Sequence, residues 1–300
     1  MGYSRNDKII VKGIGGFYYV KTADGVIEAK AKGIFRKRGI TPLAGDIVDL
    51  EKSGGDYVIS EIKERKNCFL RPPAANIDLM FLVVSAVDPI PNLLVVDKLL
   101  AIAQSKVVKT VILLTKTDLA KGSEFAEIYQ SAGFRVIDIR ADLDTAGKDI
   151  KKLAYRKHSV FIGNSGVGKS TLLNDLFDFK LQTAQTSKKL GRGRHTTRAV
   201  ELFEAVNGYV TDTPGFSAVD IEHAEYIPYD DFQYLFADIA PYVGKCRYRG
   251  CSHMSENDCA VTEAAQAGRI QKSRYDSYCA LYKKAKEIYE RDVRTKTMKT

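Results

Sequence analysis

The pattern of apolar and polar positions changes twice along the chain, and its first part has the pattern of short strands. In residues 1 to about 66, short apolar stretches alternate with glycine-containing turns, and no helical period runs through them. The stretches that predict strands are Ile9–Val11, Phe17–Val20, Val26–Ile27, Ile47–Leu50 and Tyr57–Ile59. Several short strands in so small a segment favour a small β-barrel, and the OB-type barrel is a common form that binds RNA.

The second part, from Asn76, has continuous apolar runs separated by helical stretches such as Leu93–Val107. The runs are Leu79–Val84, Val111–Leu114 and Ser159–Ile162. Continuous runs of Val, Ile and Leu are typical of strands that are buried on both faces. We therefore predict a mostly parallel α/β sheet with helices packed on it.

The third part follows Asp220, where aromatic and acidic residues lead into a group of cysteines and then into a basic segment. Ala264–Lys299 has a mainly helical pattern. These changes predict three domains: an OB-type RNA-binding domain at 1–68, an α/β domain at 69–220 and a mainly helical domain at 221–300.

Composition agrees with a folded chain. Of the 300 residues, 45% are hydrophobic and 28% are charged, which excludes intrinsic disorder. The longest apolar stretch, Leu79–Val87, contains Ser85 and stops at Asp88, well short of the roughly 20 residues that cross a bilayer. The first residues contain no apolar signal core, so we expect a cytoplasmic protein that does not enter a membrane.

The net charge of +9 favours a polyanionic partner, because Lys and Arg neutralise phosphates and release counterions. A generally basic soluble protein would have the same charge, so charge alone leaves both interpretations open. The first part offers one candidate surface, a predicted loop in which basic residues surround Phe35. It is either a contact for phosphates and bases or an ordinary solvated loop. Its basic residues are Lys30, Lys32, Arg36, Lys37 and Arg38.

A phosphate-binding loop is predicted between the run at Ser159–Ile162 and a helical stretch at Thr171–Leu176. Its glycines allow backbone N–H groups to turn towards phosphates, and the start of the helix adds a partial positive charge. We expect Lys169 to reach the β- and γ-phosphates and Ser170 to bind Mg²⁺. The residues predicted to bind the phosphates are Gly163, Asn164, Ser165, Gly166, Val167, Gly168, Lys169, Ser170 and Thr171.

A base-reading element follows the apolar run at Val111–Leu114. Thr115-Lys116-Thr117-Asp118 is close to the pattern Asn-Lys-x-Asp. A carboxylate such as that of Asp118 accepts hydrogen bonds from the ring N–H and the exocyclic amine of guanine, whereas adenine would present a lone pair to it. The stem of Lys116 would lie along the purine face. The tetrapeptide alone could be a helix N-cap, but beside a phosphate-binding loop it indicates guanine.

Two further segments complete a nucleotide site. Asp212 follows a short predicted strand and supplies an acid for Mg²⁺, and Gly215 carries an N–H that can sense the γ-phosphate. Between the phosphate-binding loop and this acid lies Gly191–Thr197, a flexible basic loop. The hydroxyls of Thr196 and Thr197 are suited to close on Mg²⁺ when the γ-phosphate is present, which predicts a switch. The alternative is an ordinary polar loop.

The order of these elements is unusual. In an ordinary GTPase the phosphate-binding loop comes first and the base-reading element fourth, whereas here Thr115–Asp118 precede Gly163. The domain is therefore circularly permuted. The chain leaves it just after Asp212–Gly215, so the segment that responds to loss of the γ-phosphate runs directly into the C-terminal part.

Together these features resemble the ribosome-small-subunit-dependent GTPase A family, and the resemblance covers nearly the whole chain. The matching features are the N-terminal barrel, Arg71-Pro72 with Asn76-Ile77-Asp78, the permuted order, Gly193-Arg194-His195-Thr196-Thr197, Asp212-Thr213-Pro214-Gly215-Phe216 and the cysteine cluster. The resemblance implies a circularly permuted GTPase domain between an OB-type barrel and a zinc-binding domain. It also implies a cytoplasmic bacterial GTPase that binds the small (30S) ribosomal subunit and its rRNA late in maturation and is stimulated by it.

Two positions depart from the family pattern. Thr115 stands where Asn is usual, and Ile139-Arg140-Ala141 lacks the usual Ser before Ala. These changes weaken contacts to guanine but leave Asp118 in place. We therefore expect these two positions to affect the affinity for guanine nucleotides more than the preference for guanine over other bases.

The group that handles the attacking water is not a glutamine, because Phe216 stands where many GTPases have one. The family resemblance gives this role to His195 in the predicted switch, and an imidazole can orient or deprotonate water. The alternatives are that His195 contacts RNA or caps the switch. His195 and Lys169 are the predicted catalytic residues.

Three of the five cysteines lie close together with one histidine late in the chain. Cys246, Cys251, His253 and Cys259 form the pattern Cys-x4-Cys-x-His-x5-Cys. Three thiolates and one imidazole are a common closed tetrahedral zinc shell, so we predict one structural Zn²⁺. The alternative is a cluster of buried reduced thiols.

The remaining cysteines and two of the histidines have no such grouping. Cys68 and Cys279 lack partners of suitable spacing and are expected to be free thiols. His158 and His223 are expected to be surface or capping residues.

The leading hypothesis is a monomeric GTP hydrolase that acts as a timer on ribosomal RNA. The barrel and the basic C-terminal part would grip RNA, and the bound GTP or GDP would set their relative arrangement. The alternative is a nucleotide-gated RNA-binding factor whose hydrolysis is incidental.

Overall fold

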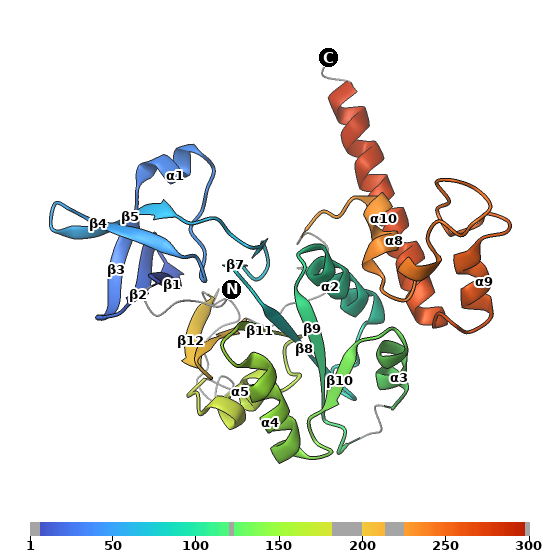
Figure 1. The fold of residues 1–300 in the computed structure, drawn as a ribbon, viewed down its shortest axis with the longest axis horizontal. Helices are drawn as coiled ribbons and strands as arrows, with labels where there is room; N and C mark the ends of the chain where they lie inside the picture. The colour runs from blue at the N-terminus through green and yellow to red at the C-terminus, as the bar shows by residue number, and fades with distance from the viewer. Residues whose placement is uncertain (1–6, 120–122, 182–199, 214–224, 298–300) are drawn as a thin grey trace.

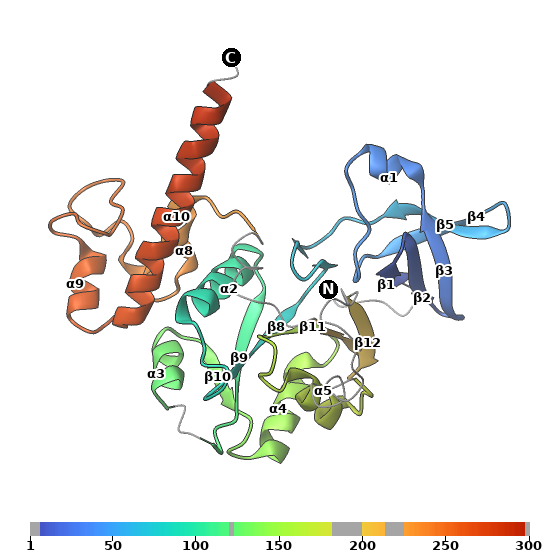
Figure 2. The same cartoon turned by 180° about the vertical axis from the view of Figure 1, so that it is seen from behind.

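The computed structural model describes residues 7–119, 123–181, 200–213 and 225–297. Figure 1 shows three parts side by side: the N-terminal barrel in blue, a central sheet with its helices and a C-terminal helical part in orange and red. The reverse view in Figure 2 shows the same order, with the end of α10 (Lys272–Thr297) projecting away from the rest. Among the described helices, none has both the length and the apolar character that crossing a membrane requires.

The N-terminal part is a closed five-stranded barrel. Its strand order is β1-β2-β3-β5-β4, with β3 and β5 parallel and the other neighbours antiparallel. The barrel closes where the Ile10 N–H donates to the Asp46 carbonyl over 2.9 Å and the Gly45 N–H donates to the Ile10 carbonyl over 2.8 Å. This arrangement confirms the predicted OB-type barrel. The strands are β1 (Ile9–Ile14), β2 (Phe17–Thr22), β3 (Gly25–Ala31), β4 (Val48–Ser53) and β5 (Asp56–Ile62).

The candidate base contact at Phe35 is not on the surface. Gly33–Lys37 forms a short helix, α1, and Phe35 on it is only 7% exposed because its ring packs into the barrel core. Lys30 is paired with Asp56 over 3.0 Å. The prediction that Phe35 contacts bases is therefore wrong. Packing in the barrel core removes the apolar surface of the ring from water, which stabilises the fold, and leaves little of the ring accessible to a base. The basic residues 36–38 do remain exposed.

The central part is the predicted mostly parallel sheet. The strands β10-β9-β8-β11-β13 are all parallel, and β12 is antiparallel to β13. All seven residues of β8 are buried, as its continuous apolar sequence predicts. A short hairpin of β6 (Cys68–Phe69) and β7 (Ala74–Ala75) precedes the sheet. The sheet strands are β8 (Leu79–Ser85), β9 (Lys109–Thr115), β10 (Arg135–Asp138), β11 (His158–Ile162), β12 (Glu201–Ala205) and β13 (Gly208–Asp212).

Helices cover both faces of this sheet and create two apolar cores. One face packs against α2 (Leu93–Ser105), α3 (Ser123–Ser131) and the C-terminal part. The other face packs against α4 (Leu143–Ala154) and α5 (Lys169–Phe177). Alternate residues of β8 belong to alternate cores, as the pleat of a strand requires.

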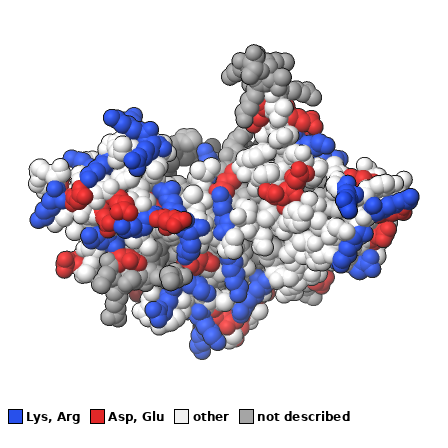
Figure 3. Space-filling model, turned by 45° about the horizontal axis from the view of Figure 1, so that its top comes forward, with Lys and Arg blue, Asp and Glu red and all other residues white. Residues whose placement is uncertain are grey.

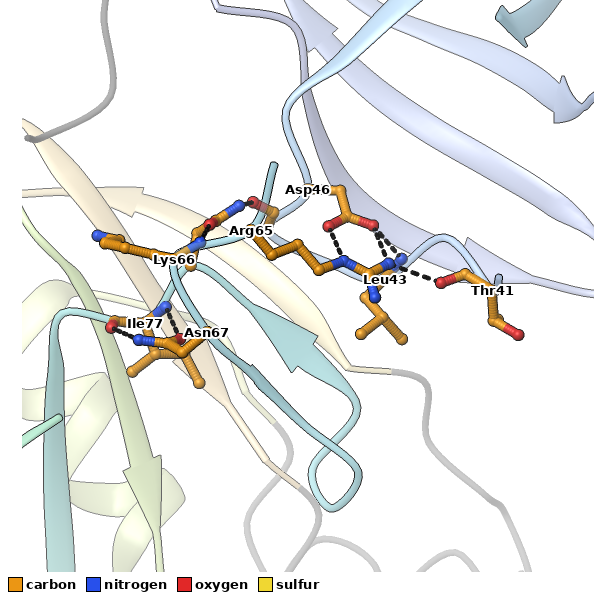
Figure 4. Close-up of polar contacts among 9 residues, drawn as sticks. Thr41, Leu43, Asp46, Arg65, Lys66, Asn67 and Ile77 are labelled. Carbon is orange, nitrogen blue, oxygen red and sulfur yellow. Dashed lines mark hydrogen bonds and ion pairs between the residues drawn. The ribbon is translucent and has the colours of Figure 1, made fainter. Parts of the chain in front are cut away.

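Polar side chains fix the barrel to the central part, as Figure 4 shows. The Asn67 amide donates to the Ile77 carbonyl and accepts from the Ile77 N–H, both over 2.9 Å. On the barrel side, the Arg65 guanidinium donates to both carboxylate oxygens of the fully buried Asp46 over 2.7 Å. Paired charge-assisted bonds of this kind constrain geometry as well as adding stability. Together with the Asn67 contacts, they hold the chain that connects the barrel to the central part in one conformation.

The C-terminal part is attached to α2 through a buried ionic group. Arg274, 1% exposed, donates to Asp97 of α2 over 2.6 Å and to Asp238 over 2.7 and 3.1 Å. Its guanidinium also lies 4.5 Å from the centre of the Phe236 ring. Besides α10, this part comprises η1 (Tyr229–Asp231), α8 (Phe232–Leu235), η2 (Ala240–Tyr242) and α9 (Ala260–Gln266). The predicted helical character of the C-terminal segment is thus confirmed.

Candidate functional site

The predicted phosphate-binding loop connects the carboxyl end of β11 to the start of α5. Gly163 passes so close to β8 that a Cβ there would lie 2.4 Å from the Val83 carbonyl oxygen. Gly166 and Gly168 have φ of +86° and +91°, a region that favours glycine. Gly163 is therefore required by the close approach of the backbone to β8, and Gly166 and Gly168 by their backbone conformation. Ser165, at the tip of the loop, is exposed.

The loop lysine and the predicted Mg²⁺ acid are brought together. Lys169, 7% exposed, donates to Asp212 Oδ1 over 2.8 Å and also to the Thr213 carbonyl. The Thr213 hydroxyl in turn donates to the Phe161 carbonyl over 2.8 Å, which fixes the end of β13 against β11. A cation and a carboxylate that face one site provide the groups that bind phosphates and a divalent metal ion.

The base-reading element lies at the end of β9 and contacts the phosphate-binding loop directly. The buried Thr115 hydroxyl lies 2.7 Å from the Val167 carbonyl oxygen and 3.2 Å from that of Val84. Lys116 has a φ of +58°, and its ammonium donates to the Asp88 carbonyl. The carboxylate of Asp118, two residues further on, is exposed.

Asp138 orders the segment Ile139-Arg140-Ala141, and the sequence analysis did not single it out. At the end of β10, its Oδ1 accepts from the Thr117 hydroxyl over 2.6 Å and from the N–H groups of Arg140 and Ala141 over 3.0 and 3.2 Å. Asp138 thereby joins the base-reading element to the segment at 139–141. A signal for it exists, because an acid at the carboxyl end of a parallel strand lies at the edge of the sheet where ligands bind.

Part of the predicted site lies outside the described residues. These positions are His195, Thr196, Thr197 and Gly215, together with the rest of the 191–197 loop, Phe216 and His223. The described nucleotide-site residues Gly163–Thr171, Thr115–Asp118 and Asp212 gather at the carboxyl edge of one parallel sheet.

The four predicted zinc ligands also come together, and their spacing fits a tetrahedral site. The ligand atoms of Cys246, Cys251, His253 and Cys259 all lie within 4.8 Å of one another. Cys246 Sγ is 3.8 Å from Cys259 Sγ, and His253 Nδ1 is 3.4 and 3.5 Å from these two sulfurs. Zn–S bonds of about 2.3 Å and a Zn–N bond of about 2.0 Å at tetrahedral angles place ligands about 3.8 and 3.5 Å apart. The donor set therefore fits Zn²⁺.

Neighbouring side chains hold the histidine in the form that binds metal. His253 Nε2 is 3.0 Å from Gln233 Oε1, an oxygen that only accepts, so Nε2 carries the hydrogen and Nδ1 presents its lone pair to the sulfurs. Burial lowers the pKa of His253, which favours the neutral ligand form. The hydroxyls of Tyr275 and Tyr278 on α10 donate to the carbonyls of His253 and Ser252 over 2.8 and 2.9 Å. Sequence analysis did not find Gln233 or these tyrosines.

His158 differs from its predicted surface or capping role. It is fully buried at the start of β11, with Nε2 2.8 Å from the Thr211 hydroxyl. Burial lowers its pKa to about 4. A Cβ at Gly45 of the barrel would lie 2.9 Å from His158 Cε1, so the barrel covers this ring. Cys68 and Cys279, by contrast, are free as predicted, and all five cysteines lie among the described residues.

Comparisons with known protein families cover most of the chain. The family model for the RsgA N-terminal domain matches residues 9–67, and the model for the RsgA GTPase matches residues 62–222. A curated relative from Caldanaerobacter subterraneus, named small ribosomal subunit biogenesis GTPase RsgA, is 40% identical over 291 residues, covering 94% of this chain and 96% of the relative. A relative of the same name from Geobacillus thermodenitrificans is 40% identical and covers 93% of this chain and 97% of its own length.

Solved structures show the same likeness. The crystal structure of YloQ, described as a circularly permuted GTPase, has a TM-score of 0.72 and 34% identity, covering 94% of this chain and 95% of that chain. The crystal structure of YjeQ from Thermotoga maritima has a TM-score of 0.75 and 27% identity, with coverage of 93% and 98%. The likeness to YloQ agrees with the permuted order of the nucleotide elements.

Proposed function

This chain belongs to the RsgA GTPase family and is a GTP hydrolase, and on that premise we propose that it acts in late maturation of the small ribosomal subunit. The observation that carries the proposal is a juxtaposition. Lys169, Asp212 and Thr115 gather at one edge of the central sheet, and this sheet lies between the barrel and the C-terminal part (Figure 1), which contains the Cys/His cluster. A nucleotide-binding part between two candidate RNA-contacting parts can couple hydrolysis to binding of a large RNA.

Binding of GTP would exchange partners within the described site. Lys169 would leave Asp212 for the β- and γ-phosphates, while the N–H groups of Gly163–Thr171 cradle the phosphates. Asp118 would accept two hydrogen bonds from guanine, and Lys116 would lie along the ring. The contact from Thr115 to Val167 would hold the base-reading element and the phosphate-binding loop in register.

Mg²⁺, when bound with GTP, would neutralise charge on the phosphates. Ser170 and Asp212 are the described residues that would hold it, and Thr196, Thr197 and Gly215 are assigned by their motifs to complete the switch. His195 would orient or deprotonate the attacking water and hold its proton on the imidazole. Lys169 would stabilise negative charge that develops on the phosphates.

The Cys/His cluster would hold a structural Zn²⁺, because a shell of four protein ligands leaves no position open for chemistry. The barrel, proposed as residues 1–68, and the C-terminal domain, proposed as 221–300, would contact rRNA on either side of a GTPase domain at 69–220. Figure 3 shows Lys and Arg side chains spread over one face, at both ends and between them, with acidic residues among them. We infer a cytoplasmic protein that works as a monomer on the subunit.

The decisive experiment measures GTP turnover with and without purified small subunits, with large subunits as the control. We expect stimulation by small subunits only. His195→Ala should slow the stimulated turnover by about 10²-fold while GTP binding stays close to that of the parent. Binding to small subunits that depends on GTP without any stimulation would instead favour a nucleotide-gated RNA-binding factor whose hydrolysis is incidental.

A further inference from the structure

A row of paired residues crosses the sheet from the barrel to the nucleotide site. In β1, Lys12 is the register partner of Glu201 in β12, and Glu201 is the partner of Asp212 in β13. Asp212 is in turn the partner of Phe161 in β11. Register partners point to the same face of a sheet, so these side chains form one row on the face that α5 covers.

Each carboxylate of this row forms an ion pair with a lysine. Lys12 Nζ lies 2.8 Å from Glu201 Oε2, and Lys169 Nζ lies 2.8 Å from Asp212 Oδ1. The two carboxylates stand opposite each other in the antiparallel pair, where Cβ atoms are about 5 Å apart. Like charges at this distance repel, and here each carboxylate is paired with a lysine.

The row connects two parts of the molecule that are far apart in the sequence. Lys12 belongs to the barrel, and β12 begins directly after the segment that holds the predicted switch. Because β1 pairs with β12, the barrel strands extend the central sheet without interruption. A second ion pair, Lys21 with Glu204 over 2.6 Å, lies on the same seam between barrel and sheet.

We propose that Glu201 is a positioning residue for the metal site, and that Lys12 of the barrel tunes it through their ion pair. The proposal rests on the proposed role of Asp212 as a Mg²⁺ ligand. The Glu201 carboxylate favours a cation beside Asp212, and the Lys12 ammonium opposes it. Anything that draws Lys12 away, such as an RNA phosphate bound at the barrel, therefore strengthens Mg²⁺ binding.

The coupling is reciprocal. If phosphate binding near Lys12 strengthens Mg²⁺ binding by a certain factor, binding of Mg²⁺ with the nucleotide strengthens phosphate binding near Lys12 by the same factor. The side chains of Lys12 and Glu201 are 30% and 39% exposed, so solvent screens the effect. We therefore expect changes of about threefold to tenfold in affinity, which shrink as salt concentration rises.

Two variants that break the same ion pair should act in opposite directions. The probe is fluorescent N-methylanthraniloyl-GDP bound to the full-length protein, titrated with Mg²⁺ at low salt. Glu201→Gln removes a negative charge and should raise the Mg²⁺ concentration for half saturation by about threefold to tenfold. Lys12→Met leaves Glu201 without its cation and should lower that concentration. If both variants shift it in the same direction, the effect is a loosened seam and the proposal is overturned.

Glu204→Gln is the matched control. It also removes a carboxylate and an ion pair from the seam, but Glu204 pairs with Tyr209 and lies on the opposite face of β12 from Glu201. We expect it to leave the Mg²⁺ titration unchanged, and a shift equal to that of Glu201→Gln would contradict the proposal.

Asp212→Asn separates this proposal from the one on which it rests. One outcome is that Asp212→Asn abolishes the Mg²⁺ dependence while the Glu201 and Lys12 variants match the parent. That result would overturn the coupling between the Lys12–Glu201 ion pair and Mg²⁺ binding but would support Asp212 as a Mg²⁺ ligand. If Asp212→Asn titrates like the parent, the assignment of Asp212 itself fails.

Discussion

The hydroxyl of Thr115 donates to the carbonyl oxygen of Val167, 2.7 Å away, and so ties the end of β9 to the phosphate-binding loop. A hydroxyl has one hydrogen, and the Val84 carbonyl, 3.2 Å from the same oxygen, competes with the nearer Val167 carbonyl for it. The residue that departs from the family pattern thus still connects the base-reading element to the phosphate site. An Asn amide at this position would offer two hydrogens, one for each carbonyl.

Removing this hydroxyl should weaken nucleotide binding without unfolding the protein. Thr115→Val keeps the shape of the side chain but leaves the buried Val167 carbonyl without its donor, a loss of about 1–2 kcal/mol. Measured by titration calorimetry, GDP affinity should fall by about tenfold. Thr115→Ser should bind like the parent, and Thr115→Asn at least as tightly. Parent-like binding by Thr115→Val would show that the contact does not position the loop.

The base preference should depend on Asp118. In Asp118→Asn, the amide donates where guanine also donates, so GTP affinity should fall by at least about tenfold while xanthosine triphosphate affinity rises. Competition against fluorescent GDP measures both affinities. Glu124→Gln, which removes an exposed carboxylate near the start of α3, should leave both unchanged. Unchanged GTP binding by Asp118→Asn would remove Asp118 from the base site.

Loss of one cluster cysteine should separate the C-terminal part from the nucleotide site. Structural zinc contributes about 10 kcal/mol or more of apparent folding free energy, so Cys251→Ala should lose zinc and unfold this region locally. The central sheet has its own core, so GTP binding and slow intrinsic hydrolysis should persist. Association with small subunits and stimulation by them should disappear.

Metal analysis and a cysteine outside the cluster control this experiment. The parent and Cys68→Ala should each contain one zinc per chain, and Cys251→Ala should contain none. If the purified parent holds no zinc, or if Cys251→Ala is stimulated like the parent, the C-terminal part does not depend on a metal for its contact with the subunit.

Short motifs in the sequence singled out most of the residues that the structure brings together at the candidate nucleotide and metal sites. The residues at 163–171 and the Cys/His cluster are local patterns, and their chemistry follows from residue type and spacing alone. Arg274 and Asp97 could not be paired in this way, because they lie 177 positions apart and meet only when α10 packs on α2. The ring of Phe35 was misplaced for a related reason: charges on both sides of it suggested exposure, but the barrel core it fills is formed by distant strands.

The buried histidine makes stability depend on pH. Burial lowers the pKa of His158 to about 4, against about 6.5 in the unfolded chain, so the unfolded state binds more protons between these values. Stability is therefore fully present above about pH 6.5 and is lost as the pH falls towards 4. His158→Gln retains a hydrogen-bonding partner for the Thr211 hydroxyl but cannot take up a proton.

Urea unfolding at pH 7, 6 and 5 measures this effect. Between pH 7 and pH 5, the free energy of unfolding of the parent should fall by about 2 kcal/mol more than that of His158→Gln. Protonation of zinc ligands and surface carboxylates affects both proteins equally and cancels in the difference. Parallel curves would mean that His158 takes up its proton in the folded state as readily as in the unfolded chain, and that the barrel does not seal it from water.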